Sequence, residues 1–250
     1  MNALENIFYN HDGRLIHKWH HYLEIYDHYF NKYINKNVKI LEIGVSQGGS
    51  LQMWKKYFGN NVTIYGLDIN PQCKSLEEEN IHIFIGSQSD RGYLRWLKTQ
   101  IPKIDILLDD GGHTMKQQII TFEELFDHIN DNGIYMCEDC ETSYMLEFGG
   151  GYRRRGTFIE YSKQLVDKIN AWHSCKLSVD EFTKNAKSIN FYTGMVVIEK
   201  GLIDIPKSVM VGEKSFNVVS DKVTSNNIVM KLCILIDKVL NRLKLPSLFR

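Results

Sequence analysis

Two acidic clusters in this 250-residue sequence each follow a short apolar run. The residues Asp-Asp-Gly-Gly-His at 109–113 follow the run 104–108, and Glu138 and Asp139 follow the run 134–137. If the two runs form neighbouring parallel strands, both clusters emerge at the carboxyl edge of one sheet. Open α/β sheets bind their ligands at that edge. The spacing therefore indicates an active site there.

The residue types in these clusters suit a hard divalent cation such as Mg²⁺. Asp110, Glu138 and Asp139 offer three carboxylates, and Mg²⁺ takes a few carboxylates while waters or substrate oxygens complete its shell. His113 is a candidate proton acceptor beside the ion. In the alternative interpretation, strand-end acids cap the helices that follow. That role suits Asp109, because neighbouring strand residues point to opposite faces.

A glycine-rich turn is a candidate cofactor loop. Gly44, Gly48 and Gly49 allow close backbone approach, and a helix N-terminus there would donate amides. Their spacing is not G-x-G-x-x-G, so the dinucleotide fingerprint is absent. Asp68 ends the next apolar run, where a carboxylate accepts hydrogen bonds from ribose hydroxyls, although it could instead cap the segment from Pro71. Together the turn and Asp68 favour an adenosine-bearing cofactor.

Alternating strand and helix patterns position these residues. They predict an α/β fold, a mostly parallel doubly wound sheet with helices on both faces. The runs 188–192 and 195–199 are separated by two residues, which join only antiparallel strands, so the sheet is expected to end in a hairpin. The expected strands are 38–45, 62–69, 81–85, 104–110 and 133–138. The expected helices are 14–34, 51–58, about 93–99, 115–129 and 158–172.

Composition narrows the class of protein. The length suits one large domain, or one domain with an appendage. The zero net charge gives no global field to recruit nucleic acid or a membrane. Five irregularly spaced cysteines and no apolar leader predict a reducing, cytoplasmic location. Cys137 and Cys140 form a C-x-x-C, but the acids between them would raise a thiol pKa. We therefore favour buried thiols over a redox pair.

Two further groups have alternative interpretations. His17, His20 and His21 have a spacing that permits zinc, but the surrounding aromatic residues favour a core or cofactor-covering helix. Arg153, Arg154 and Arg155 form a run in a glycine-rich loop, which by default is solvated. The same loop could serve as a lid arm that meets a substrate phosphate.

The last part of the chain, residues 203–250, breaks the alternation and is predicted to be an extension of a domain spanning 1–202. Residues 226–245 have a helical apolar stripe, but Lys231, Lys238, Arg242 and Lys244 interrupt the segment. Its uninterrupted apolar stretch is therefore much shorter than the roughly 20 residues a membrane span needs. The favoured interpretation is a helix packed on its own domain or on a second subunit, which makes a homo-oligomer plausible. Its basic polar side leaves a membrane-surface helix as the alternative.

Ten short motifs occur in order over roughly residues 12–201. They are His20-x-Tyr22-x-x-x-Tyr26, LEIGV at 41–45, YGLD at 65–68, DDGGH at 109–113, ED at 138–139, TSY at 142–144, GGG at 149–151, TFIE at 157–160, NFY at 190–192 and VVIEK at 196–200. As an ordered set they resemble the macrocin- and mycinamicin-type sugar O-methyltransferases, which are class I S-adenosylmethionine enzymes with relatives often labelled cephalosporin hydroxylase-like or rhamnosyl O-methyltransferases.

The sequence departs from the family pattern at two positions. Gly112 stands where many members have serine, and Cys140 replaces a more usual aliphatic residue. Residues 203–250 match nothing known in the family.

The resemblance implies a Rossmann-like class I methyltransferase fold with helical additions at both ends, S-adenosylmethionine and Mg²⁺ as cofactors, and a sugar hydroxyl as acceptor. The sugar would belong to a glycan, glycolipid, antibiotic or nucleotide-activated sugar, and the arginine loop favours a phosphate-bearing one. His113 matches the general base. Asp110, Glu138 and Asp139 match the metal ligands. The family holds its cofactor at the positions of Glu42, Gly44, Ser46, Asp68, Ser87 and Gln88, and we add Asp109 and Tyr22 to this cofactor set. The predicted substrate-binding residues are Tyr144, Arg153 and Arg154.

Two rival functions remain. A metal-dependent methyltransferase acting on a catechol would use the same residues, because adjacent hydroxyls on a ring also chelate an ion. A cofactor-binding fold could instead serve as a scaffold subunit through its C-terminal helix. The intact set of Asp110, His113, Glu138 and Asp139 argues against that second possibility.

Overall fold

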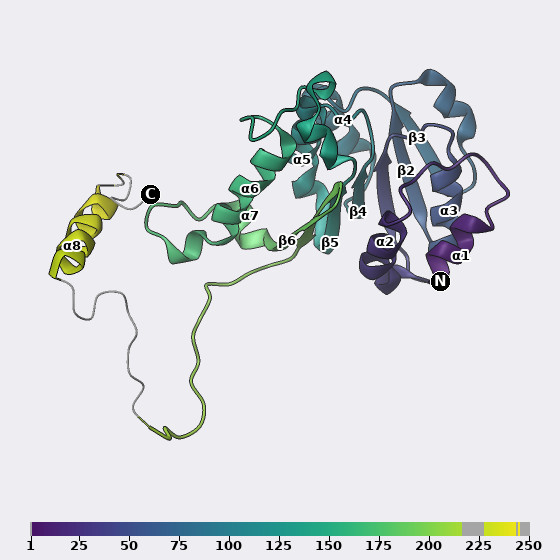
Figure 1. Cartoon of the computed structure of the whole chain (residues 1–250). Helices are drawn as coiled ribbons and strands as arrows, with labels where there is room; N and C mark the ends of the chain where they lie inside the picture. The colour runs from purple at the N-terminus through teal and green to yellow at the C-terminus, as the bar shows by residue number, and fades with distance from the viewer. Residues whose placement is uncertain (1, 217–227, 244, 246–250) are drawn as a thin grey trace.

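A computed structural model describes residues 2–216, 228–243 and 245 of the chain. Its centre is a seven-stranded sheet with the order β3-β2-β1-β4-β5-β7-β6 (Figure 1). Strands β1 to β5 pair in parallel, whereas β7 is antiparallel to both of its neighbours. The strands are β1 Lys39–Ile43, β2 Thr63–Asp68, β3 Ile81–Ile85, β4 Ile104–Asp109, β5 Ile129–Cys137, β6 Ala186–Tyr192 and β7 Met195–Lys200.

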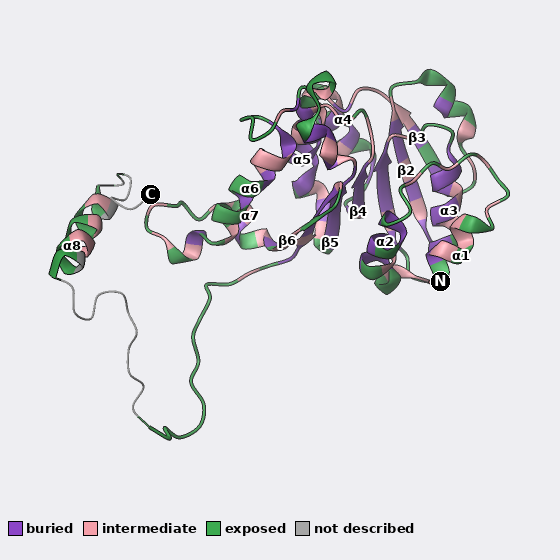
Figure 2. Cartoon of the chain, viewed as in Figure 1, coloured by how far each residue is buried: buried purple, intermediate pink, exposed green. Residues whose placement is uncertain are grey.

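Helices cover both faces of this sheet, as the alternation predicted (Figures 1 and 2). Neighbouring strand residues point to opposite faces, so Ile40 packs in one buried cluster with Trp54, while Leu41 packs in the other with Phe122. The helices that contribute to the first cluster are α1 Ala3–Tyr9, α2 Tyr22–Phe30 and α3 Gly49–Phe58. Those that contribute to the second are α4 Arg91–Gln100, α5 Met115–Leu125 and α6 Phe158–Ile169. Two further α-helices are α7 Glu181–Asn185 and α8 Ile228–Arg242.

The helix expected over 14–34 is wrong in its first part. Helix α2 begins at Tyr22, and residues 11–19 have no helix or strand. The polar groups of this part bond elsewhere: Arg14 N–H donates to Gln52 Oε1 at 2.9 Å and its guanidinium to the Leu76 carbonyl at 2.8 Å. A Cβ on Gly49 would lie 2.3 Å from the Arg14 carbonyl oxygen, so this segment runs directly against the start of α3. We call residues 11–21 the crossing segment.

The predicted hairpin is confirmed, and it inserts its second strand into the sheet. Strand β7 lies between β5 and β6, and the two hairpin strands are joined at Thr193 and Gly194, where Gly194 has a φ of +73° that suits glycine. The Gly194 carbonyl accepts hydrogen bonds from Cys140 N–H at 2.8 Å and from the Tyr22 hydroxyl at 2.9 Å. The hairpin tip therefore touches the carboxyl end of β5.

Beyond β7 the chain leaves the sheet domain. Residues 202–216 are mostly exposed and form no helix or strand, and helix α8 follows at the end of this arm (Figure 1). Among the described residues, no helix combines the length and the apolar character that crossing a membrane requires.

Candidate active site

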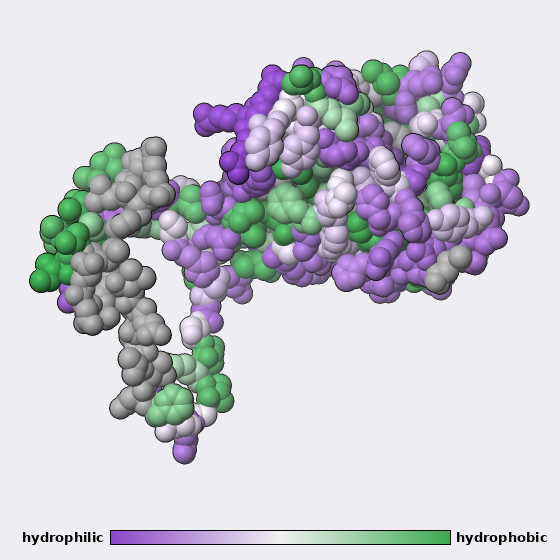
Figure 3. Space-filling view, viewed as in Figure 1, coloured by the Kyte–Doolittle hydropathy of each residue, from purple (hydrophilic) through white to green (hydrophobic). Residues whose placement is uncertain are grey.

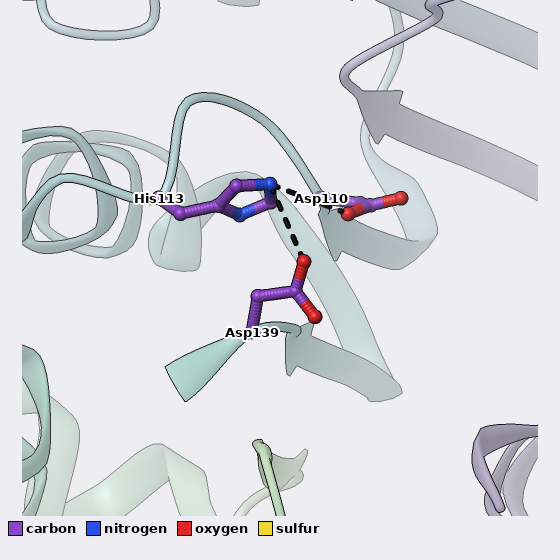
Figure 4. A group of neighbouring side chains, drawn as sticks. All are labelled: Asp110, His113 and Asp139. Carbon is purple, nitrogen blue, oxygen red and sulfur yellow. Dashed lines mark ion pairs between the residues drawn. The ribbon is translucent and has the colours of Figure 1, made fainter. Parts of the chain in front are cut away.

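The two acidic clusters meet at the carboxyl edge of the sheet, as the sequence predicted. Strands β4 and β5 pair in parallel with Asp109 opposite Cys137, so the two acidic clusters leave the sheet side by side. His113 Nε2 lies 3.8 Å from Asp110 Oδ1 and 3.4 Å from Asp139 Oδ2 (Figure 4). Ligand atoms of these three side chains all lie within 4.8 Å of one another, so the imidazole stands directly beside the two carboxylates. Glu138, the third predicted metal ligand, bonds the Tyr26 hydroxyl and the Lys18 ammonium.

The backbone at this edge is held in an uncommon conformation. His113 and Asp139 have φ values of +56° and +51°, in the left-handed region, which residues other than glycine seldom adopt and which costs about 1–3 kcal/mol at each position. The Thr142 hydroxyl lies 2.9 Å from the His113 carbonyl and 2.7 Å from the Asp139 carbonyl. Thr142 therefore fixes both site residues through the backbone.

Lys18 is a site residue that the sequence interpretation missed. It comes from the crossing segment, and 3% of its side chain is exposed. Its ammonium lies 2.5 Å from Asp110 Oδ2, 3.1 Å from Glu138 Oε2 and 3.7 Å from Glu42 Oε1. Burial opposes the charge of Lys18, but these three carboxylates outweigh it and raise the lysine pKa.

Negative charge is in excess at this site. Burial is the main cause that raises the pKa values of Glu138 and Glu42. Glu138 also accepts a short hydrogen bond from the Tyr26 hydroxyl, and Glu42 accepts one from Trp54 at 2.8 Å. Asp110, Glu138 and Glu42 lie around the ammonium of Lys18, and a fourth carboxylate, Asp139, lies beside His113. This donor set fits a divalent cation, because oxygen ligands and unbalanced negative charge are what such an ion requires.

Replacing Lys18 with methionine is expected to destabilise the fold by about 3–5 kcal/mol at pH 7, because removing one partner of a buried ion pair leaves the other charges uncompensated. Urea unfolding measures the loss. The matched control is Lys36→Met, since Lys36 is exposed. A loss for Lys18→Met no larger than that of the control would refute the role of Lys18 as the internal counter-charge.

A cavity of about 400 Å³ opens beside the acidic edge. At its floor Gly44 has a φ of +94°, and a Cβ there would lie 1.9 Å from the Asp110 carbonyl oxygen, so this position requires glycine. Asp68 Oδ2 accepts hydrogen bonds from the N–H groups of Val45 and Ser46 at 2.9 and 3.0 Å. The predicted cofactor residues that line the cavity are Gly44, Ser46, Asp68, Ser87 and Gln88.

Three other predicted cofactor residues, Glu42, Asp109 and Tyr22, lie behind this lining. Asp109 accepts a hydrogen bond from Gln88 Nε2 at 2.9 Å, and Gln88 Oε1 accepts one from Gly112 N–H at 2.7 Å. Burial raises the pKa of Asp109 to about 7. The buried Asp109 side chain thus orients Gln88, which lines the cavity, and a part for Asp109 in binding a cofactor stays a prediction.

The predicted substrate residues lie outside the same cavity. More than half of the Tyr144 side chain is exposed. The Arg153 guanidinium stacks 5.3 Å from the centre of the Tyr152 ring, and Arg154 donates to the Gly150 carbonyl at 3.2 Å. In this structure the arginines are engaged by their own loop, and their part in binding a substrate stays a prediction.

The histidines of the crossing segment do not converge on a metal. His17 lines the cavity, whereas His20 bonds the Tyr9 hydroxyl at 2.6 Å and His21 bonds the Thr193 carbonyl at 3.0 Å. Trp19 Nε1 donates to Asp139 Oδ1 at 3.1 Å. The zinc interpretation is therefore wrong, and this segment covers the cavity without being a helix.

The comparisons with known proteins agree with this geometry, although no protein-family model matches. The chain is 32% identical over 196 residues to the 8-demethyl-8-(2-methoxy-alpha-L-rhamnosyl)-tetracenomycin-C 3'-O-methyltransferase of Streptomyces olivaceus, covering 73% of this chain and 50% of that protein. It is 33% identical over 201 residues to the demethylmacrocin O-methyltransferase of Streptomyces fradiae, covering 74% and 50%.

Among solved structures, the chain is similar to the MycE methyltransferase from the mycinamycin biosynthetic pathway in complex with Mg, SAH and mycinamycin VI. The TM-score is 0.72 at 31% identity, and the match covers 80% of this chain and 54% of that one. The chain thus spans about half the length of the curated relatives it matches. The expected class I methyltransferase fold is confirmed. The chain belongs to the family of macrocin- and mycinamicin-type sugar O-methyltransferases.

Proposed function

We propose that this chain is a Mg²⁺-dependent O-methyltransferase that moves a methyl group from S-adenosylmethionine to a hydroxyl of a sugar. The observation that carries the proposal is the position of His113 between Asp110 and Asp139 beside the cavity. The names of the relatives support it, since they are O-methyltransferases of sugar-bearing antibiotics. In this proposal residues 1–202 are the methyltransferase domain, residues 203–250 are an extension, and the location is cytoplasmic.

The proposed acceptor is a small molecule with adjacent sugar hydroxyls. A sugar hydroxyl has a pKa far above neutral and attacks poorly unless it loses its proton. The two cofactors would supply Lewis-acid polarisation of that oxygen and an activated methyl group. The chain would hold the ion with Asp110, Glu138 and Asp139.

The proton step is assigned to His113. Its Nε2 faces the acidic edge, where it can accept the hydroxyl proton as the oxygen attacks the methyl carbon. Asp139 offers one oxygen to His113, while the other accepts from Trp19 and Tyr22 at 3.1 and 3.2 Å. Fixed partners on one oxygen keep the second aimed at the imidazole. The products are a methyl ether and S-adenosylhomocysteine.

Calorimetric titration with S-adenosylhomocysteine tests the cofactor assignment. We expect the chain to bind it and Asp68→Ala to bind roughly 10–100-fold more weakly, because a hydrogen bond to a charged group contributes about 1.5–3 kcal/mol. Asp167→Ala, on an exposed surface of α6, is the control, and NAD is titrated in parallel. A folded chain that binds NAD and not S-adenosylhomocysteine would contradict the proposal.

A screen of acceptors separates the proposed function from its catechol rival. Sugars with adjacent hydroxyls, their nucleotide-linked forms and catechols are each supplied with and without Mg²⁺. Methylation of a sugar that requires Mg²⁺ supports the proposal. Methylation confined to catechols would replace it with the rival reaction.

A further inference from the structure

Helix α8 presents a continuous apolar face that the described chain leaves exposed. Large apolar side chains recur along it at three- and four-residue spacing, and 83% of Ile228 and 59% of Leu235 are exposed. Figure 3 shows this apolar surface at the end of the arm, away from the sheet domain. The exposed apolar residues of the stripe are Ile228, Leu232, Leu235, Ile236, Val239 and Leu243.

The contact between α8 and the sheet domain involves the opposite side of the helix. Asp237 Oδ1 lies 3.8 Å from the ammonium of Lys176. Asp237 is five positions from Leu232 and two from Leu235, so at about 100° per residue it lies across the helix from the apolar stripe. The expectation that the apolar stripe packs on its own domain is wrong, because the large apolar side chains of the stripe are exposed.

Basic residues border the apolar stripe along one edge. Lys231, Lys238 and Arg242 are spaced i, i+7 and i+11, which aligns them on one line beside Leu235. Residues 203–250 contain eight Lys and Arg against four Asp and Glu, a net charge of +4, whereas residues 1–202 contain 22 against 26, a net charge of −4. Positive charge is therefore concentrated on the part of the chain that also exposes the apolar stripe.

We propose that α8 binds the surface of an anionic lipid bilayer, with its apolar stripe at the acyl boundary and its basic edge at the headgroups. Long basic side chains extend from such an edge toward lipid phosphates. A second copy of α8 is a less suitable partner for the apolar stripe. Pairing two such helices would bring their basic edges together, without the acidic residues that paired helices use to balance such charges. The proposal concerns where the enzyme works and stands apart from its chemistry.

The test is co-sedimentation of the full chain with phosphatidylcholine vesicles, with and without about one third phosphatidylglycerol. We expect at least roughly tenfold stronger binding to the anionic vesicles, and weakening by salt. Leu232→Asp/Val239→Asp should abolish binding, and Lys231→Glu/Lys238→Glu should remove the preference for anionic lipid. The matched controls are Leu202→Asp/Ile205→Asp and Lys36→Glu/Lys56→Glu, at exposed positions outside α8.

Sedimentation velocity on the same proteins tests the alternative, in which a second copy of α8 packs on the apolar stripe. A dimer that Leu232→Asp/Val239→Asp dissociates, with no binding to either vesicle, would overturn the proposal in favour of a second copy. Vesicle binding that survives the aspartate pair would also overturn it. Titration with S-adenosylhomocysteine confirms that each variant is folded, so loss of lipid binding is separable from failure of the proposed activity.

Discussion

Replacing His113 with alanine is expected to lower turnover by roughly 10²–10⁴-fold, which is the usual contribution of a positioned general base. His113 Nε2 sits 3.4 Å from Asp139 Oδ2 at the acidic edge, so the substitution removes the group that we propose accepts the hydroxyl proton. Steady-state kinetics with saturating cofactor measures the loss, and calorimetry with S-adenosylhomocysteine should show unchanged affinity.

His173→Ala is the matched control for that experiment, because His173 is exposed in the segment after α6. The left-handed backbone at His113 adds a second variable, since alanine adopts that conformation less readily than asparagine does. His113→Asn therefore separates the lost base from local strain. Full turnover in either His113 variant would refute the base assignment.

Asp110→Asn is the second change with a large expected effect. Asp110 Oδ1 faces His113 and Oδ2 contacts Lys18, so this carboxylate lies at the centre of the proposed ion site. The amide keeps the shape but removes the charge that a hard divalent cation needs. We expect Mg²⁺ binding by calorimetry to be lost together with Mg²⁺-dependent turnover, a fall of roughly 10³-fold or more, since several kcal/mol of transition-state stabilisation depend on such an ion.

The control for Asp110→Asn is Asp167→Asn, which removes one exposed carboxylate far from the acidic edge in sequence. Turnover by Asp110→Asn that Mg²⁺ still stimulates would show that Asp110 is not a ligand. Retained Mg²⁺ affinity without activity would point to Glu138 and Asp139 as a sufficient ligand pair, and it would likewise contradict the central role given to Asp110.

The sequence predicted the sheet well because its strands are strongly patterned. Apolar runs bounded by glycine or acids located β1 to β5, and the two residues between 192 and 195 required the antiparallel hairpin. The meeting of the two acidic clusters at one edge of the sheet followed from the parallel pairing of β4 and β5. These features depend on the apolar pattern of each strand and on the lengths of the connections, and both can be identified in a single sequence.

Contacts between distant segments were beyond the sequence. Lys18 lies 92 positions from Asp110 and 120 from Glu138, and no spacing rule relates a lone lysine to acids so far along the chain. The path of the crossing segment could not be predicted for the same reason, and its aromatic residues and histidines instead suggested an amphipathic helix. Its path follows from hydrogen bonds to Gln52 and Leu76, which only the assembled fold brings near.

The position of β7 also sets the order in which the site can be completed during synthesis. Residues 1–185 contain β1 to β5, but they leave one edge of β5 without a partner. Cys137 at the end of β5 pairs with Val196, and Cys140 N–H bonds the Gly194 carbonyl. A ribosome-bound chain therefore carries an open strand edge beside its acidic cluster until about residue 200 has emerged, and chains ending earlier expose that edge to other strands.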